Sequence, residues 1–217
     1  MHRGLYLVVS SVVFSAVSVF GGPNLLNNPS FENFSVTSTS YTGIGNGGSS
    51  AATDWMVWNN TNVTTNTLIC PGDPNCPAGS PSPADGAHML YVDTPGAFNG
   101  IWQQWAPTNT GSDNATTVAF VYVVSGAVQV GTGNDGSTVK ELVLVPTGTW
   151  QQVTWFNSQL FNKPANEIIF YSDGAGAQFF VDGVQVVDGL PEPATFALTG
   201  GALVALGLIA RKRRARK

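Results

Sequence analysis

Short apolar runs separated by turn residues dominate the chain between residues 24 and 188. Val, Ile, Thr and aromatic residues form the runs, while clusters rich in Gly, Pro, Asn, Asp and Ser separate them, a pattern typical of β-strands. The predicted strands cover residues 53–58, 87–93, 100–105, 116–124, 127–131, 138–145, 149–156, 167–171 and 178–187. The pattern therefore predicts an antiparallel β-sandwich rather than alternating β–α units.

One predicted strand, AHMLYVD at residues 87–93, carries apolar side chains on both of its alternating faces. We expect one of these faces to lie in the core and the other to be covered by loops. Residues 41–50 and 59–85 show no such alternation and are rich in Gly, Asn, Thr, Ser and Pro. They are predicted to be long loops, which in compact domains are often functional.

The N-terminal residues 1–22 have the layout of a secretory signal peptide. Arg3 gives a short basic start, residues 5–20 are apolar, and the small residues Ser18, Gly21 and Gly22 mark a cleavage region within 18–22. A retained membrane helix is the alternative, but the run is barely long enough and no stop-transfer charges follow it. The sequence therefore predicts export.

The C-terminal residues 190–217 combine three elements in order. These are the motif Pro191, Glu192 and Pro193, an apolar run at 194–210, and a basic tail at 211–217. As a helix the apolar run would be about 25 Å long, the lower limit for crossing a bilayer, and the basic tail would lie on the cytoplasmic side. The predicted organisation is a signal peptide at 1–22, a β-sandwich domain at 23–189 and a membrane-inserted C-terminal signal at 190–217.

Charge separates the body of the chain from its ends. Of nine Lys and Arg residues only Lys140 and Lys163 lie between residues 32 and 188, against twelve acids, so this part has a net charge of about −10. An acidic body is a poor partner for phosphate backbones, which argues against nucleic-acid binding. It suits neutral ligands or divalent cations.

The two cysteines, Cys70 and Cys76, lie in the turn-rich segment CPGDPNCP. Such turns can bring their Cα atoms within disulfide range. Zinc would need two further ligands, and His88 is the only histidine of the mature chain. In an exported protein the pair is predicted to form a disulfide that fixes local shape.

The body resembles galactose-binding-like jelly-roll domains, the fold of many carbohydrate-binding modules. The motifs that carry the resemblance are NLLNNPSFE (24–32), DWMVW (54–58), DGAHMLYVD (85–93), GIWQQ (100–104), GTWQQVT (148–154) and FFVDGVQV (179–186). They occur in the order that such domains show, and NLLNNPSFE corresponds to an opening strand. The resemblance implies a jelly-roll β-sandwich.

The same resemblance implies a structural calcium ion held by Glu32 and Asp182, since calcium prefers hard oxygen ligands. The alternative is that both are exposed acids at strand ends. Tryptophan carries sugar recognition in many such modules, because an indole stacks on the C–H face of a sugar ring. Of the six tryptophans most would be core residues, whereas Trp58 and Trp102 are the candidates for ligand binding.

The C-terminal signal resembles the PEP-CTERM sorting signal of Gram-negative bacteria. This resemblance implies an exosortase as partner, which would cut near the Pro-Glu-Pro motif and release a membrane-tethered precursor to the cell surface or extracellular matrix. The sortase signal LPxTG is a poorer match, because Pro193 and Ala194 stand where Thr and Gly are required. A permanently anchored single-pass protein is the remaining alternative.

Catalysis has little support in the sequence. There is no G-x-S-x-G nucleophile elbow, and His88 lies within a predicted strand, where a structural role is favoured. We therefore predict a non-enzymatic component of an exopolysaccharide or biofilm matrix. The alternatives are a lectin-like carbohydrate-binding module and, less favoured, a hydrolase that acts on polysaccharide.

Overall fold

The computed structural model describes residues 24–105, 116–134, 137–156 and 166–187. Ten strands occur in these ranges: β1 (Ser38–Ser49), β2 (Met56–Cys70), β3 (Met89–Thr94), β4 (Asn99–Gln104), β5 (Thr116–Ser125), β6 (Val128–Asn134), β7 (Ser137–Leu144), β8 (Gln151–Phe156), β9 (Glu167–Ser172) and β10 (Ala177–Val187). All nine strand pairings are antiparallel, which confirms the predicted all-β antiparallel class.

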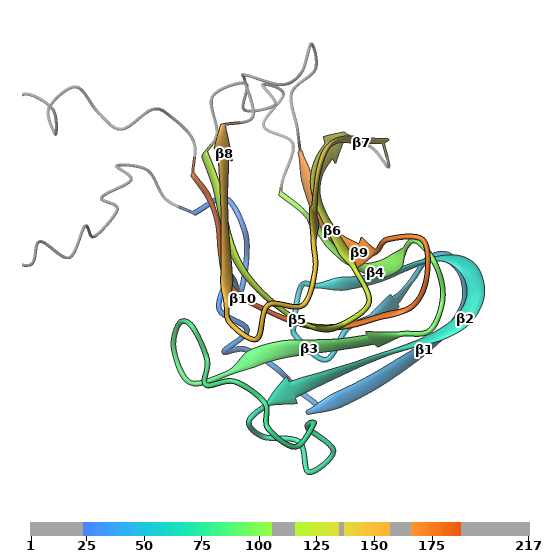
Figure 1. Cartoon of the computed structure of the whole chain (residues 1–217), viewed down its shortest axis with the longest axis vertical. Coiled ribbons are helices and arrows are strands. Elements are labelled where there is room, and N and C mark those ends of the chain that lie inside the picture. Colours follow the sequence, from blue (N-terminus) through green and yellow to red (C-terminus); the bar gives the residue numbers. More distant parts are fainter. Residues whose placement is uncertain (1–23, 106–115, 135–136, 157–165, 188–217) are drawn as a thin grey trace, which may run out of the picture.

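A single sheet in the order β7-β6-β9-β4-β2-β3-β10-β5-β8 forms both layers of the fold, and β1 pairs with β2 beside this path. Strand β2 belongs to both layers, because residues 56–59 pair with β4 and residues 66–70 pair with β3. Figure 1 shows the resulting halves, with β7, β6, β9 and β4 opposite β10, β5 and β8. From β3 to β10 every connection except the β6–β7 hairpin changes halves, as in jelly rolls.

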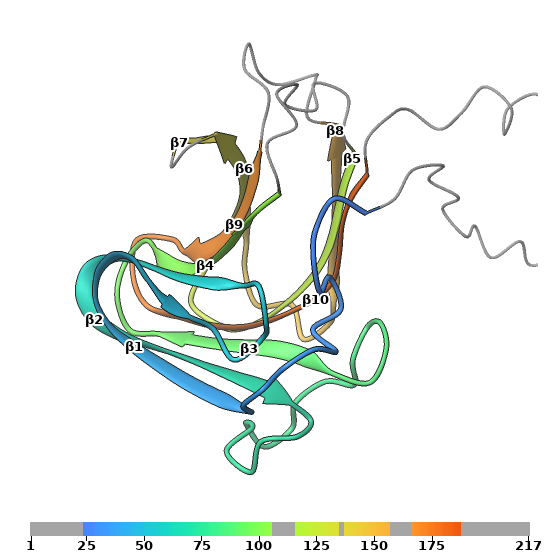
Figure 2. The ribbon, with the colours of Figure 1, turned by 180° about the vertical axis from the view of Figure 1, so that it is seen from behind.

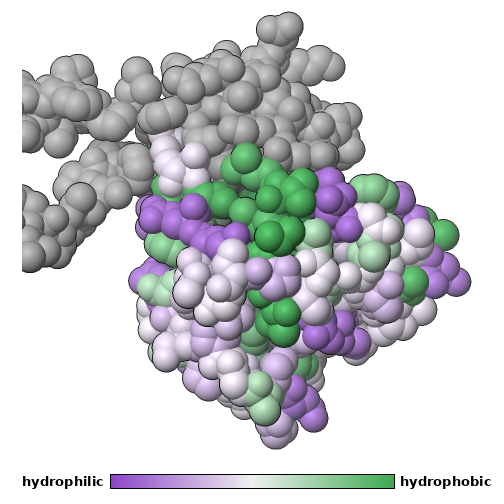
Figure 3. Space-filling view, viewed as in Figure 1, coloured by the Kyte–Doolittle hydropathy of each residue, from purple (hydrophilic) through white to green (hydrophobic). Residues whose placement is uncertain are grey.

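The main core lies between the two halves. Because side chains alternate along a strand, Ile168 and Phe170 of β9 point inward from one half, while Phe179 and Val181 of β10 and Leu90 of β3 point inward from the other. All five are fully buried. Apolar surface on the face seen in Figure 3 gathers in the middle of the view, between the halves.

The outer face of β3 and β10 carries a second, smaller cluster. Met89 and Tyr91, the residues that alternate with Leu90, pack there with Phe180 and Cys70. This agrees with the expectation that residues 87–93 are buried on both sides. Loop residues that follow β2 cover this face, and Cys76 and Trp150 pack at its margin.

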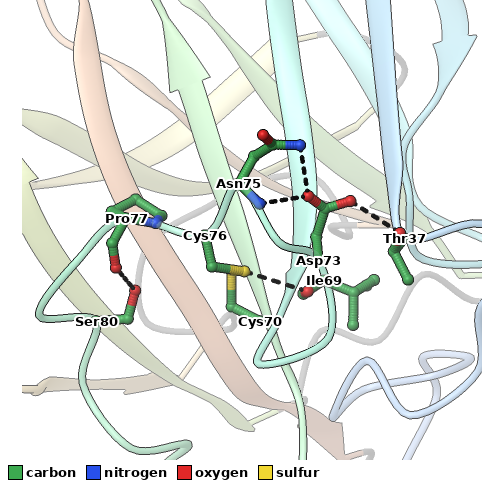
Figure 4. Close-up of a disulfide and its surroundings, with 8 residues drawn as sticks. All are labelled: Thr37, Ile69, Cys70, Asp73, Asn75, Cys76, Pro77 and Ser80. Carbon is green, nitrogen blue, oxygen red and sulfur yellow. Dashed lines mark hydrogen bonds between the residues drawn. A yellow bond between two sulfur atoms is a disulfide. The ribbon is translucent and has the colours of Figure 1, made fainter.

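A disulfide joins Cys70 and Cys76, as predicted, with Cα atoms 5.9 Å apart (Figure 4). Within the loop that it closes, Asp73 accepts hydrogen bonds of 2.8 Å from the Asn75 backbone N–H and the Thr37 hydroxyl. These hydrogen bonds lower the pKa of Asp73. The short loop is therefore fixed by side-chain contacts as well as by the disulfide.

Two predictions about loops are wrong. Residues 41–50 lie almost entirely in β1, and residues 59–70 are most of β2, so of the second expected loop only the part after residue 70 is a connection, which runs to residue 88. The two strands form a polar hairpin, in which hydroxyl pairs such as Thr39–Thr67 at 2.8 Å and Thr42–Thr64 at 2.6 Å join them. Threonine favours strands, but a hairpin with this much polar surface lacks the alternation of apolar residues on which the prediction relied.

The expected opening strand at residues 24–32 is also wrong. Only Asn24 makes an isolated bridge, to Val187, and the segment before β1 appears without a strand arrow in Figure 2. The backbone at Asn28 and Phe31 has positive φ values of 46° and 57°, which end any extended run. Pro29 between them has no N–H to donate to a sheet.

Candidate ligand-binding site

The outer face of β2, β4 and β9 carries aromatic side chains, two of which remain partly exposed. Trp58 on β2 and Trp102 on β4 are partly exposed, whereas the residues that precede them, Val57 and Ile101, are fully buried. Alternation therefore directs both indoles away from the core. Tyr171 of β9 points the same way, because the core residue Phe170 precedes it.

Strand register brings these residues together. Gly100 of β4 stands directly between Trp58 on one neighbouring strand and Tyr171 on the other. Strands lie about 4.8 Å apart, so the two aromatic residues stand roughly 10 Å apart with no side chain between them. A Cβ at position 100 would lie 1.9 Å from the Phe170 carbonyl oxygen. The glycine is thus required by the close approach of β9 and leaves a gap between the rings.

A pocket of about 210 Å³ occupies this face, and it is called the aromatic pocket below. Its lining consists of Asn46, Trp58, Asn60, Phe98, Trp102, Glu167, Ile169 and Tyr171. The rings supply flat apolar walls, while two amides and one carboxylate supply polar groups. Apolar walls with a few polar groups are typical of sites for small molecules.

Phe98 at the rim of the aromatic pocket has an unusual backbone conformation. Its φ is +57°, a region that non-glycine residues adopt rarely and at a cost. The Phe98 N–H donates a 2.9 Å hydrogen bond to the Ser172 carbonyl, and its ring centre lies 6.2 Å from that of Tyr171. The side chain remains 41% exposed. The ring therefore stands at the rim of the aromatic pocket, partly exposed and beside Tyr171.

Two buried asparagines hold the corner beside the pocket. Asn99 accepts hydrogen bonds from the backbone N–H groups of Asn60 at 2.6 Å and Thr61 at 3.1 Å. Asn59 accepts a 2.6 Å hydrogen bond from the Thr65 hydroxyl. Both asparagines are fully buried. They fix the backbone from which the Asn60 amide reaches the aromatic pocket.

A second pocket, of about 260 Å³, lies at the margin of the covered face. Its lining is mainly backbone and small or proline side chains, including Pro77, Gly79 and Pro146. The two rings that reach it, Tyr122 and Phe180, already contact each other with centres 6.2 Å apart. This hollow offers a ligand neither a free aromatic face nor a charged group.

Trp58 and Trp102, the tryptophans singled out in the sequence, line one and the same pocket. Their role in binding stays a prediction. Trp58 lies within β2 and not beside the long loop that was expected to begin at residue 59. Sequence reasoning missed Phe98, Glu167 and Tyr171. Tyr171 ends a correctly predicted strand, but nothing in the sequence showed which strand would lie beside β4.

Glu32 and Asp182, the expected calcium ligands, hold two parts of one loop. Asp182 Oδ2 accepts hydrogen bonds from the N–H groups of Ala84 at 2.7 Å and Asp85 at 2.8 Å. Glu32 Oε1 accepts from the N–H groups of Ala87 at 2.6 Å and His88 at 2.9 Å. The N–H groups occupy oxygens that a cation would need. In the described part of the chain no three His, Cys, Asp or Glu residues are grouped to hold a metal, and calcium stays a prediction.

The electrostatics of the two acids differ. Asp182 is fully buried, so it is not the exposed acid that the alternative prediction expected. Burial raises the pKa of Asp182 to about 6, although the hydrogen bonds that it accepts act in the opposite direction. Burial also opposes the charge of Glu32, but hydrogen bonds from His88 and Ala87 outweigh it and lower the pKa. His88 Nδ1 lies 2.8 Å from Glu32 Oε2, which gives the histidine a structural partner.

The predicted signal peptide at 1–22, the motif Pro191, Glu192 and Pro193, and the apolar run at 194–210 lie outside the described residues. Within the residues that are described, no helix is long and apolar enough to cross a membrane. Export, membrane insertion and processing therefore remain predictions from the sequence.

No protein-family model matches this sequence, and no curated protein matches it either. Solved structures with a similar course of the chain include carbohydrate-binding modules and also the enzymatically active domain of a bacteriophage CBA120 tailspike protein, the latter at 12% identity and a TM-score of 0.42. A family 61 module in complex with β-1,4-galactotriose has 15% identity and a TM-score of 0.49, covering 76% of this chain and 99% of its own.

Two further modules are similar to this chain at a comparable level. A family 11 module of a cellulosomal cellulase from Clostridium thermocellum has 13% identity and a TM-score of 0.45, covering 81% of this chain and 99% of its own. The xylan-binding family 22 module from Paenibacillus barcinonensis has 14% identity and a TM-score of 0.44, covering 78% and 97%. At these levels the function has to be argued from the residues of this chain.

Proposed function

We propose that this protein is an exported, non-enzymatic carbohydrate-binding protein that holds a sugar in the aromatic pocket. The observation that carries the proposal is the gathering of the partly exposed Trp58 and Trp102 with the buried Tyr171 around one pocket on the outer sheet face. A sugar ring has an apolar C–H face and a rim of hydroxyl groups. Partly exposed indoles suit the first, and the amides of Asn46 and Asn60 suit the second.

The size of the aromatic pocket suits one sugar unit of a longer chain. Its volume of about 210 Å³ is below the roughly 300–1,000 Å³ that is common for sites of drug-sized ligands. The pocket lies on the open face of a sheet and not inside a barrel, so the neighbouring units of a polysaccharide could extend along the surface. Weak, repeated contacts of this kind suit a matrix component.

The chemistry of the lining supports binding without hydrolysis. Most glycoside hydrolases need two carboxyl groups that flank the scissile bond. Among the described residues that line the aromatic pocket, Glu167 supplies the one carboxylate. His88 lies outside this lining and pairs with Glu32.

The proposal includes export and processing. Residues 1–22 and 190–217 resemble an export signal and a PEP-CTERM signal, and a disulfide suits an oxidising compartment outside the cytoplasm. An exosortase would cut near Pro191, Glu192 and Pro193 and release the β-sandwich to the surface or matrix of a Gram-negative bacterium. Mass spectrometry of the mature protein tests this part: a C-terminus near residues 191–193 supports it, and an intact Lys217 refutes it.

Binding is tested by glycan-array screening and affinity electrophoresis in polysaccharide gels with the mature protein. Trp58→Ala and Trp102→Ala should each abolish the retardation that the wild-type protein shows, while Trp150→Phe, on the covered face, should not. Each variant is first compared with the wild type by thermal melting, so that loss of binding is separated from loss of folding. Silence of the wild-type protein across the array and the gels would overturn the proposal in favour of a purely structural matrix protein.

A further inference from the structure

We propose that the outer edge of β1 is a self-association surface, through which two copies of this protein pair antiparallel and form one continuous sheet. The inference goes beyond the proposed function, because it does not depend on sugar binding. It follows from the backbone, the charges and the exposed apolar side chains of the β1–β2 hairpin.

Strand β1 has an open edge among the strands that the structure describes. It pairs with β2 alone, and Figure 1 shows it as the outermost strand beside β2. The Ile69 N–H donates a 2.8 Å hydrogen bond to the Thr37 carbonyl, so the polar backbone groups of the odd-numbered residues 37–43 point toward β2. Those of the even-numbered residues 38–42 point toward the open edge, where they can pair with another strand.

The β1–β2 hairpin carries no charge, unlike the rest of the domain. Neither of its strands contains an Asp, Glu, Lys, Arg or His. Between residues 32 and 188 the chain has twelve acids and two lysines, so two copies repel each other over most of their surfaces. The hairpin is the region where a second copy can approach without this repulsion at close range.

The two ends of the main sheet path lack this combination. Strand β7 includes Lys140 and Glu141, and charged residues discourage edge-to-edge pairing. Strand β8 has six residues against twelve in β1, and short edge strands are poor templates as well. Among the described edge strands, β1 is therefore the one best suited to pair with a second molecule.

The exposed side chains of β1 make the edge complementary to itself. Val36, just before the strand, is 47% exposed, and Ile44 within it is 68% exposed. The two residues lie symmetrically about Ser40, and the pairing of β1 with β2 has no register shift from residue 38 to residue 43. In a twofold pair that sets Ser40 opposite the partner's Ser40, Val36 lies opposite the partner's Ile44, and the reverse holds too. The apolar pairs would leave water together.

The same register aligns the backbone. Even-numbered residues of one copy lie opposite even-numbered residues of the other, so their outward N–H and C=O groups can form an antiparallel ladder. The Ser40 hydroxyl donates to Asn66 Oδ1 at 2.6 Å, and the Thr42 and Thr64 hydroxyl oxygens lie 2.6 Å apart. These contacts order the hairpin but leave the outward backbone groups for the partner. A preordered edge loses little conformational freedom on association.

Sedimentation equilibrium of the mature protein, without sugar, tests the proposal. We expect a monomer–dimer equilibrium that shifts toward the dimer as salt is raised, because salt screens the repulsion between the acidic domains. A protein that stays monomeric up to roughly 1 mM at high salt would overturn the inference.

Two variants that add the same charge locate the interface. Ile44→Glu places a carboxylate against the second copy and should weaken dimerisation at least about tenfold. Val143→Glu, at a valine of β7 that is 53% exposed, should have little effect. Thermal melting first shows that both variants fold. Equal weakening by the two variants would mean that overall charge and not β1 controls association, and would overturn the inference.

Cysteine cross-linking tests the register. The two native cysteines form a disulfide, so an introduced cysteine supplies a free thiol. A mixture of the Val36→Cys and Ile44→Cys variants should form cross-linked dimers under mild oxidation. Neither variant alone should do so, because equivalent positions would stand roughly 26 Å apart in the pair. Cross-linking of either variant with itself, and not in the mixture, would overturn the proposed pairing.

The outcomes separate this inference from the proposed function. A dimer that forms through β1 and binds no glycan would support the inference and overturn the proposed function. A monomer that binds sugar through Trp58 and Trp102 would do the reverse.

Discussion

The two outer faces of this sheet both carry aromatic clusters. The cluster on β3 and β10 is covered by a loop, so this is the closed face, and the other is the open face. On the face of β3 and β10, Tyr91 and Phe180 lie with ring centres 4.9 Å apart, and both are buried under the disulfide-closed loop. The neighbouring Trp150 donates its indole N–H to the Ser82 carbonyl at 2.9 Å. On the face of β2, β4 and β9, by contrast, Trp58, Trp102 and Phe98 remain partly exposed around a pocket.

The difference shows how to separate packing aromatics from candidate ligand platforms. The covered face already provides contacts for its own aromatic residues. Tyr91 and Phe180 pack against other rings and the loop, and Trp150 donates its indole N–H to a backbone carbonyl, so these residues need no ligand. Phe98 keeps its ring exposed in a strained backbone conformation. Composition alone cannot make this distinction, because both faces are rich in aromatic residues.

The largest expected effect comes from breaking the closed cluster. Phe180→Ala removes a fully buried ring that contacts Tyr91 and Tyr122, and we expect it to lower the free energy of unfolding by about 3–5 kcal/mol. Urea denaturation measures this loss. A change below about 1 kcal/mol would show that the closed face is not a true secondary core.

Opening the disulfide should have a smaller effect. Cys70→Ser with Cys76→Ser releases a loop of only six-residue separation, so the expected loss is about 2 kcal/mol or less. The affinity for sugar should not change, because the disulfide-closed loop and the aromatic pocket lie on opposite halves of the sheet. Calorimetry and denaturation of the double variant test both statements, and loss of binding without unfolding would contradict the separation of the two faces.

On the open face, Trp58→Ala should affect binding more than folding. We expect at least a tenfold loss of affinity, about 1.4 kcal/mol, because the indole provides a stacking surface. The free energy of unfolding should fall by much less than in Phe180→Ala, since Trp58 is only partly buried. Equal losses of stability in the two variants would remove the contrast between the faces.

The pattern of apolar residues predicted most strands of both halves, including β3, β5, β9 and β10, because each alternates against the core. It missed the β1–β2 hairpin, whose strands are held by hydroxyl and amide pairs. Trp58 and Trp102 were identifiable as candidates. Their placement in one pocket with Tyr171 depends on the register Trp58–Gly100–Tyr171, which joins three strands distant in sequence and leaves no local signal.

Acidity should act on the closed face through Asp182, which lies on the same face of β10 as Phe180 and holds the covering loop. Its pKa is raised from 3.8 to about 6, so the folded state binds more protons than the unfolded state in this interval. The contribution of Asp182 to stability should therefore fall as pH rises from about 4 to about 6. Thermal melting across this range should show that the stability of the wild type, relative to that of Asp182→Asn, decreases as pH rises. A relative stability of the wild type that increases with pH contradicts the assignment.

Calcium provides a separate check on the same residue. If Asp182 and Glu32 bind calcium, the ion must displace N–H donors of the covering loop, and adding it above pH 6 should raise the melting temperature. An unchanged melting temperature with calcium and with chelator would remove the calcium prediction.

The smallest effect is expected at Phe98. Phe98→Asn places a residue that tolerates positive φ at this strained position, so stability should rise by about 0.5–1 kcal/mol. Affinity for sugar should decrease severalfold because the rim loses a ring. Denaturation and calorimetry of the same preparation measure the two opposite changes; a loss of stability would show that the ring packs and does not serve the pocket.

The central claim, that the open face binds sugar and the closed face does not, is tested most directly by the indole N–H signals in an NMR titration. Glucosamine and N-acetylglucosamine oligosaccharides are added to the ¹⁵N-labelled mature protein. The signals of Trp58 and Trp102 should shift together and saturate, while those of Trp55 in the core and Trp150 on the closed face stay in place. Shifts at Trp150 with Trp58 and Trp102 unchanged, or no shifts with any of these sugars, would contradict the account.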